Sequence, residues 1–246
     1  MKIVLLLPLI LVFFGACSSG QRFDTSTPEG SFALAEKFES DGRFEEAINQ
    51  FNSVRNQHPY SRLAVEARLR VADIHFRRKS FPEAQASYQV FKELYPRHPR
   101  SDYVTYQLAL SYFKQLPSTI DRDLSLSQPA LLFFEEVLRS YPESEYAALA
   151  AERRQEVLKM LAEKEHYIAH FYFIRNHYRS ALGRFESLWT DHRGLGFDLK
   201  ALYGASISAY RSQNLDQARK YLKLLTEGFP EEPETLRAQQ EIRGEG

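Results

Sequence analysis

The sequence has few of the residues from which most catalytic and metal centres are built. A single cysteine among 246 residues excludes a cysteine metal cluster, and we find neither a glycine-rich phosphate loop nor a nucleophile elbow. Lys and Arg together number 32, as do Asp and Glu, so no excess of positive charge indicates nucleic-acid binding. No catalytic residue, metal site or cofactor is therefore predicted. A non-enzymatic binding protein is favoured, and 43% hydrophobic residues suffice for a packed core.

Long hydrophobic runs are also absent, except near the start of the chain. Residues 3–14 are apolar apart from Pro8, a run shorter than the roughly 20 residues of a membrane span but typical of a signal peptide. Small residues precede Cys17, and polar, flexible residues follow it. This is the pattern of a lipobox, with Phe14 in place of the usual Leu. We therefore predict that residues 1–16 are a cleaved signal peptide and that Cys17 is covalently lipidated.

The alternative is an ordinary signal peptide followed by a free thiol. Thioacylation explains both the position of Cys17 and its lack of a pairing partner. Because each buried CH₂ group contributes about 0.8 kcal/mol, two or three acyl chains would anchor the protein without a membrane span. By resemblance to Gram-negative lipoproteins, Ser18 favours the outer membrane. Residues 17–28 form the predicted lipidated, flexible tether.

An internal repeat organises the remaining chain. Four copies have a key alanine with a large, mostly aromatic residue three positions before it and another four positions after it, and the copy at Ala130 has only the later one, Phe134. The small alanine allows two antiparallel helices to approach closely, the large side chain fills the space one turn later, and a proline twelve positions after the alanine ends the second helix. This is the pattern of a tetratricopeptide repeat (TPR) of about 34 residues. The key alanines are Ala47, Ala84, Ala130, Ala181 and Ala218, and Arg193 replaces the proline in the fourth copy.

The spacing of the key alanines predicts where the repeats are interrupted. The first two are 37 positions apart and so are the last two, whereas the intervals between them are 46 and 51 positions. We assign the first excess to an insert at Leu116–Gln128, bounded by helix-breaking prolines, and the second to a linking helix at Glu145–Leu161.

These observations predict an all-α fold, a TPR-like solenoid of about five helical hairpins. Repeats 1–3 are expected in residues 29–144, and the linking helix with repeats 4–5 in residues 145–246. Plain helical hairpins without superhelical order are the alternative.

Repeat proteins of this kind bind partners on the surface formed by the first helix of each hairpin, and the register predicts which side chains face it. In repeats two and three the set contains two guanidinium groups, a carboxylate and three aromatic rings: Arg70, Asp73, Arg77, Tyr103, Tyr106 and Phe113. Such a set suits a short peptide with an aromatic side chain and a free carboxylate. In the alternative interpretation, the tyrosines pack against the neighbouring repeat and the arginines are solvated.

A pair of histidines resembles half of a zinc site. His166 and His170 are four positions apart, which places both on one face of a helix. The intervening Tyr-Ile-Ala lacks the glutamate of the zinc motif. We therefore predict two solvated histidines rather than metal ligands.

Three segments are more specific than the repeat pattern. Repeat three opens with His-Pro-Arg-Ser-Asp-Tyr-Val-Thr-Tyr at residues 98–106, the insert contains Asp121, Arg122 and Asp123, and repeat four contains Arg184 in Gly-Arg-Phe-Glu. Together with the lipobox and the five repeats, they make the mature chain similar to the BamD (ComL) family of lipoproteins.

The resemblance implies a scaffold of the outer-membrane protein assembly (BAM) complex, lipid-anchored on the periplasmic face of the outer membrane. The C-terminal repeats would bind a POTRA domain of the BamA-type barrel subunit. Arg184 matches an arginine used towards that subunit, and we group Asp121, Arg122 and Asp123 with it as candidate interface residues. The N-terminal repeats would recognise the C-terminal signal of unfolded outer-membrane proteins. Accessory BAM lipoproteins are further candidate partners. The alternative function is that of a TPR lipoprotein for pilus secretin assembly or cell-wall coordination.

Overall fold

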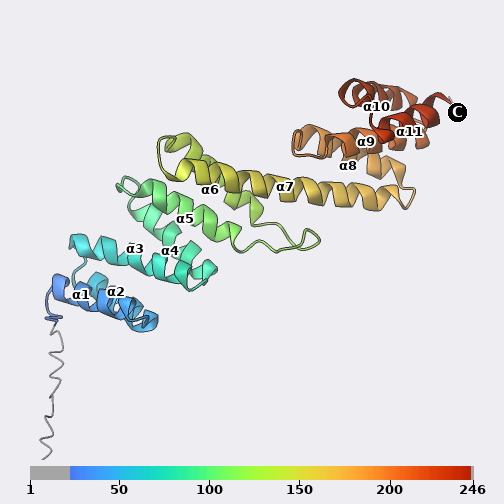
Figure 1. The fold of residues 1–246 in the computed structure, drawn as a ribbon. Helices are drawn as coiled ribbons and strands as arrows, with labels where there is room; N and C mark the ends of the chain where they lie inside the picture. Colours follow the sequence, from blue (N-terminus) through green and yellow to red (C-terminus); the bar gives the residue numbers. More distant parts are fainter. Residues whose placement is uncertain (1–22, 245–246) are drawn as a thin grey trace, which may run out of the picture. The chain divides into compact units, whose positions relative to one another are not determined.

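The computed structural model describes residues 23–244, so that Cys17, the predicted signal peptide and part of the predicted tether lie outside it. Between residues 23 and 244 the regular secondary structure is helical throughout, which confirms the all-α prediction (Figure 1). The helices are α1 (Pro28–Ser40), α2 (Phe44–Gln57), α3 (Arg62–Arg77), α4 (Phe81–Leu94), α5 (Ser101–Phe113), α6 (Ser127–Ser140), α7 (Tyr146–Phe173), α8 (Tyr178–Asp191), α9 (Asp198–Arg211), α10 (Leu215–Gly228) and α11 (Pro233–Arg243). None of these helices is both long and apolar enough to cross a membrane.

The described chain divides into two compact units. The first ends at Ala67 and the second begins at Arg68, so the division falls within α3. The boundary predicted between residues 144 and 145 lies inside the second unit, because α7 packs against helices on both sides of it in the sequence.

The first unit contains the hairpin of α1 and α2. Ala35 and Ala47 are fully buried, and the ring centroids of Phe32 and Phe51 lie 5.1 Å apart in an edge-to-face arrangement. At the start of α1, the hydroxyl of Thr27 accepts a hydrogen bond at 3.1 Å from the backbone amide of Gly30. This amide has no hydrogen-bond partner within the helix. The small and large positions of the repeat thus have the roles that the pattern predicts.

The turns inside the hairpins share one backbone geometry. Five positions before the key alanine, the backbone has a positive φ in repeats one, two, four and five: 73° at Gly42, 62° at Lys79, 62° at Asn176 and 63° at Gln213. The next amide then donates to a carbonyl five residues earlier, as from His177 to Tyr172 at 3.0 Å. This is the hydrogen bond that closes a Schellman motif, and it ends the first helix of each of these hairpins.

The second helices also end at equivalent positions. The residue eleven positions after each key alanine leaves the helical region, with φ between −125° and −141°. A following proline enforces this change in four copies, because it disfavours the helical conformation of the residue before it. In the fourth copy α8 still ends at Asp191, and the guanidinium of Arg193 lies 4.5 Å from the ring centre of Trp189.

In the second unit, α7 joins two groups of helices. It packs against α5 and α6, with Ala150 and Val157 in their core, and against α8 and α9, with Ala162 and Ala169 in theirs. The helix has 28 residues, because the predicted linking helix continues without a break into the first helix of repeat four (Figure 1). The C-terminal α11 packs on α9 and α10.

The insert of repeat three begins and ends two residues before the predicted segment Leu116–Gln128. It occupies the residues between α5 and α6, because α6 already begins at Ser127. Pro129 therefore does not break a helix. It is the third residue of α6, where an amide would have no hydrogen-bond partner within the helix.

Candidate binding site

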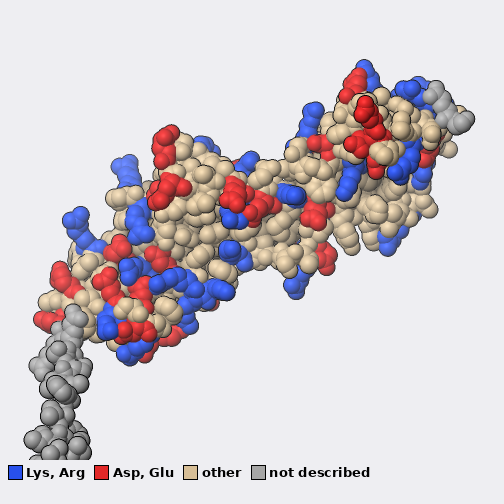
Figure 2. All heavy atoms as spheres, viewed as in Figure 1, with Lys and Arg blue, Asp and Glu red and all other residues tan. Residues whose placement is uncertain are grey.

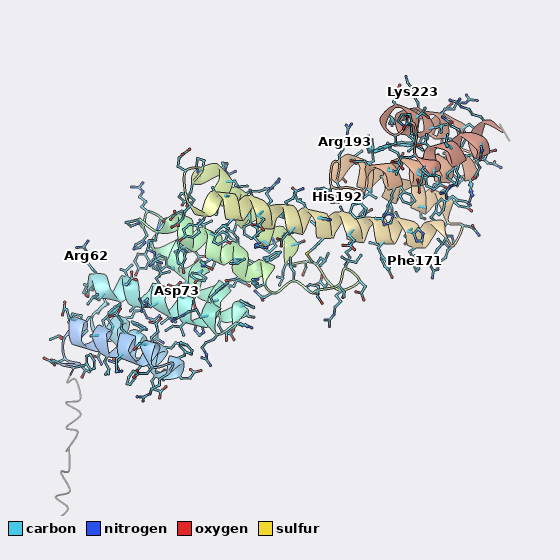
Figure 3. The ribbon with its side chains drawn as sticks, viewed as in Figure 1. Arg62, Asp73, Phe171, His192, Arg193 and Lys223 are labelled. Carbon is cyan, nitrogen blue, oxygen red and sulfur yellow. The ribbon has the colours of Figure 1, made fainter. Side chains whose placement is uncertain are left out.

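The carboxylate of Asp73 is the centre of a polar and aromatic cluster in the second unit. It accepts two hydrogen bonds from phenol groups, at 2.7 Å from Tyr88 of α4 and at 2.7 Å from Tyr103 of α5. The two tyrosine rings meet edge to face, with centroids 6.4 Å apart. Figure 3 labels Asp73 on α3. One carboxylate therefore ties three consecutive helices together.

Two further tyrosines extend this cluster to α7. The ring of Tyr146, in the first turn of α7, stacks on Tyr106 at 5.3 Å and lies 5.5 Å from Tyr103. Tyr106 also lies 6.1 Å from Phe134 of α6, and only 6% of it is exposed. We call Asp73, Tyr88, Tyr103, Tyr106 and Tyr146 the tyrosine cluster. Its packing agrees with the alternative interpretation, in which the tyrosines pack against the neighbouring repeat.

Burial controls the protonation of this cluster. It raises the pKa of Asp73 above its ordinary value, although the two phenol hydrogen bonds and the charges of Arg100 and Arg70 oppose the shift. Burial also raises the pKa of Tyr88 and of Tyr103, and the negative charge of Asp73 adds to both shifts. Both tyrosines therefore remain neutral donors.

The remaining residues of the predicted peptide-binding set surround the cluster at different depths. Arg70 is half-buried one turn before Asp73, whereas Arg77 is exposed one turn after it. Phe113 is half-buried, with its ring 6.3 Å from Phe134. Sequence reasoning missed Arg100, whose guanidinium lies 4.5 Å from the ring centre of Tyr103. The structure thus brings Asp73, Tyr103 and Tyr106 together, with basic side chains near them.

The candidate partner residues of the insert are exposed. The charged side chains of Asp121, Arg122 and Asp123 all lie on the surface. The ammonium group of Lys164 on α7 donates to the carbonyl of Arg122 at 2.7 Å. Hydrogen bonds from Thr119 and Ser125 lower the pKa of Asp121 and Asp123, respectively. The loop is therefore held near α7 with both carboxylates ionised.

Arg184 on α8 forms an ion pair with Glu165 on α7. The Nη1–Oε2 distance is 3.3 Å, and the exposed fractions of the two side chains are 48% and 15%. Because half of the guanidinium side chain is exposed, it can reach a partner without leaving this carboxylate. Figure 2 shows acidic and basic side chains interspersed on the visible face of the second unit, with no large field of one sign.

The two histidines occupy different environments. His170 is exposed, but His166 is half-buried, with ring centroids 5.4 Å from Phe197 and 6.5 Å from Phe185. The prediction of two solvated histidines is therefore wrong for His166. Burial, the charge of Lys200 and the proximity of His170 lower its pKa to about 4. Among residues 23–244, no three His, Cys, Asp or Glu side chains are grouped so that they could hold a metal ion.

Comparisons with known proteins identify the family of the chain. A family model described as "YfiO: Outer membrane lipoprotein" matches residues 26–195. The outer membrane protein assembly factor BamD of Caulobacter vibrioides is 30% identical over 190 residues, which cover 77% of this chain and 62% of that protein. BamD of Rickettsia prowazekii is 28% identical over 241 residues, which cover 94% of this chain and 93% of that protein.

Among solved structures, the TPR2AB-domain:pHSP90-complex of yeast Sti1 aligns with 88% of this chain and 84% of its own, with 13% identity and a TM-score of 0.46. The family model covers more than half of the chain and includes α1 to α8. The chain therefore belongs to the BamD (YfiO) family of outer-membrane lipoproteins.

Proposed function

We propose that this protein is a non-enzymatic scaffold of the outer-membrane protein assembly machinery, lipid-anchored through Cys17 on the periplasmic face of the membrane. The observation that carries the proposal is the family match over residues 26–195, which includes the insert, α7 and Arg184. Two relatives that align with this chain bear the name outer membrane protein assembly factor. Helical hairpins bind partners through their surfaces, and a long helix such as α7 holds two groups of them in one unit.

The barrel subunit is the first proposed partner. Its contact would involve Arg184 and the loop of Asp121, Arg122 and Asp123, which supply both signs of charge on exposed side chains. An acidic residue of a POTRA domain can share the guanidinium with Glu165, and charge pairs at an interface contribute mainly to specificity and to the rate of association.

Affinity purification from detergent-solubilised membranes tests this contact. We expect the BamA-type subunit to co-purify with the wild type and to be depleted by Arg184→Glu. Arg179→Glu, which reverses an exposed charge on the same helix, is the matched control and should not deplete it. Glu165→Lys combined with Arg184→Glu restores the internal ion pair, so recovery of binding would show that Arg184 acts only within its own chain. Purification of a pilus secretin in place of the barrel subunit would favour the alternative function.

The second proposed partner is the C-terminal signal of unfolded outer-membrane proteins. Since Tyr106 is almost fully buried and the phenol of Tyr103 already donates to Asp73, the cluster would serve as a rigid frame. The basic side chains around it, Arg70 and Arg77, would contact the peptide carboxylate.

Photo-crosslinking of a peptide that ends in phenylalanine tests this site. We expect Arg77→Glu to reduce labelling at least threefold, because the substitution reverses a charge on an exposed side chain. Arg62→Glu, another exposed change on α3, is the control (Figure 3). Labelling that survives both Arg70→Glu and Arg77→Glu would place the peptide elsewhere.

A further inference from the structure

A cavity lies in the C-terminal part of the second unit. This cavity of about 280 Å³, here called the C-terminal cavity, opens between α7, α8, α9 and α11. Aromatic rings form its apolar part: Phe173, Phe185 and Tyr203. Ligand pockets for drug-sized molecules measure about 300–1,000 Å³. The volume therefore suits a single large side chain better than a cofactor.

The floor of the cavity depends on a glycine of α9. A Cβ atom at Gly204 would lie 2.4 Å from the Phe185 ring, so the absence of a side chain lets the ring rest against the helix. Phe173 supports the same ring, with centroids 6.0 Å apart. These rings form a rigid apolar surface at which a side chain from another molecule can be buried.

The rim of the cavity has more positive than negative charge. Lys200 and Arg237 provide two cations, and Glu234 provides one carboxylate, 4.0 Å from Arg237. His166 in the wall remains neutral at neutral pH, because its pKa is lowered to about 4. The net charge is complementary to a carboxylate group and disfavours a metal cation.

The helix that supplies Glu234 and Arg237 is held firmly. Arg211 of α9 forms two hydrogen bonds with Glu241 of α11, at 2.7 and 3.1 Å, and a third with the hydroxyl of Tyr178 at 3.1 Å. Its guanidinium also lies 5.6 Å from the ring centre of Phe173. The cavity is therefore preformed, which reduces the entropic cost of binding.

We propose that the C-terminal cavity binds an extended segment of a partner protein, which inserts one aromatic or large aliphatic side chain between the rings and places an adjacent carboxylate against Lys200 and Arg237. The site shares no residue with the tyrosine cluster or with Arg184. It goes beyond the proposed function, and its test requires neither the barrel subunit nor a C-terminal signal.

Fluorescence anisotropy with a labelled peptide tests the site in the full chain. The probe is Gly-Ser-Gly-Phe-Asp-Gly-Ser, amidated at its C-terminus so that it has no terminal carboxylate. Burial of a phenylalanine and a charge-assisted hydrogen bond each contribute enough for at least a tenfold change in affinity. We therefore expect the Phe→Ala and the Asp→Asn peptides each to bind at least tenfold more weakly. Equal binding of all three peptides would overturn the proposal.

Substitutions in the protein locate the binding. Lys200→Glu and Arg237→Gln should each weaken binding of the Phe-Asp peptide about tenfold. Lys200 lies in the first turn of α9, where a glutamate is compatible with the helix dipole, so the fold is retained. Lys159→Glu, an exposed change on α7 away from the cavity, is the matched control. Weakening by Lys159→Glu or by Arg77→Glu to the same extent, or full binding by Lys200→Glu, would show that the peptide does not bind in the cavity.

Discussion

The tyrosine cluster and the C-terminal cavity are built at equivalent positions of the repeat but are filled in opposite ways. The first lies among α3, α4, α5 and α7, and the second among α7, α8, α9 and α11. A shift of 97 positions in the sequence relates the first four members of the cluster to cavity residues, and a shift of 88 relates the fifth, because the insert lies between them. The pairs are Asp73 with His170, Tyr88 with Phe185, Tyr103 with Lys200, Tyr106 with Tyr203, and Tyr146 with Glu234.

This correspondence shows that the repeat pattern does not determine which residues occupy the positions that line the tyrosine cluster and the cavity. In the cluster, a carboxylate and two phenols close the space between three helices. At the positions equivalent to Asp73 and Tyr88, the cavity has His170 and Phe185, which form no such carboxylate–phenol pair, and the space remains open. The cation and its ring also exchange places: Arg100 lies over Tyr103 in the cluster, whereas Lys200 lies 5.7 Å from the ring centre of Phe197 at the cavity. One fold thus provides a closed frame and an open pocket.

The largest effect on stability is expected from removing the carboxylate at the centre of the tyrosine cluster. Asp73→Ala removes the acceptor of two hydrogen bonds and leaves the fully buried phenol of Tyr88 without its partner. We expect the free energy of unfolding to fall by about 3 kcal/mol. Asp73→Asn retains an acceptor oxygen and should cost less than about 1 kcal/mol. Urea unfolding followed by circular dichroism measures both; equal losses would show that the hydrogen bonds do not hold the cluster together.

Enlarging the equivalent tyrosine in each region distinguishes the filled tyrosine cluster from the open C-terminal cavity. Tyr106→Trp adds volume to a side chain that is only 6% exposed, and we expect a loss of about 2 kcal/mol from overpacking. Tyr203→Trp enlarges the equivalent side chain at the edge of a cavity and should change stability by less than about 0.5 kcal/mol. Urea midpoints of the two variants provide the measurement. Similar losses would contradict the assignment of an open space at Tyr203.

Protonation of His166 makes the stability of the region around the C-terminal cavity depend on pH. Because the pKa of His166 falls from 6.5 to about 4 on folding, the unfolded chain binds more protons between these values. The stability that its neutral form contributes is therefore present above pH 6.5 and is lost as the pH falls towards 4. Solvent screening of the half-buried ring limits the loss to about 1–2 kcal/mol. Thermal unfolding of wild type and His166→Phe across this range should show curves that diverge below pH 6.5; parallel curves would contradict the shift.

Exchange of residues between the two sides tests the correspondence directly. His170→Asp combined with Phe185→Tyr places a carboxylate and a phenol at the positions that Asp73 and Tyr88 occupy in the cluster. We expect a gain in stability of up to about 1 kcal/mol, because a charge-assisted hydrogen bond forms but the carboxylate is partly desolvated. Binding of the Phe-Asp peptide should fall, since the rim loses its net positive charge. Retained peptide binding would show that the two sites are not interchangeable.

The features that were predictable from the sequence are those that depend on local constraints. Buried alanines mark the close approach of two helices, and prolines mark helix ends, so the five hairpins follow from their spacing. The stacking of Tyr146 on Tyr106 joins residues 40 positions apart, and no repeated feature of the sequence indicates it. The proposed ligand groups were predicted from register alone, which does not reveal that Tyr88 and Tyr103 share one carboxylate.

The C-terminal cavity was not predicted, because it depends on positions that lack the large or hydrogen-bonding side chains found in the tyrosine cluster. Its floor depends on the contact between Gly204 and Phe185, which are on different helices. His166 was predicted to be solvated because the residues between it and His170 lack the glutamate of the zinc motif, but Phe197 from the following repeat packs against it. A comparison of the two repeat groups position by position would have indicated the site, since Lys200 occupies the position at which the earlier group has the half-buried Tyr103.

The turns provide the test with the smallest expected effect. Lys79 and Gln213 have exposed side chains and positive φ values of 62° and 63°, one in the hairpin beside the cluster and one in the hairpin beside the cavity. A left-handed conformation is unfavourable for residues other than glycine, but glycine also loses more entropy on folding. Lys79→Gly and Gln213→Gly should therefore each raise stability by less than about 1 kcal/mol, and by similar amounts, in urea unfolding. Equal gains in stability would show that the tyrosine cluster and the C-terminal cavity differ only in the side chains between their helices. A loss of stability in one variant alone would mean that the turn of that hairpin also contributes to the difference.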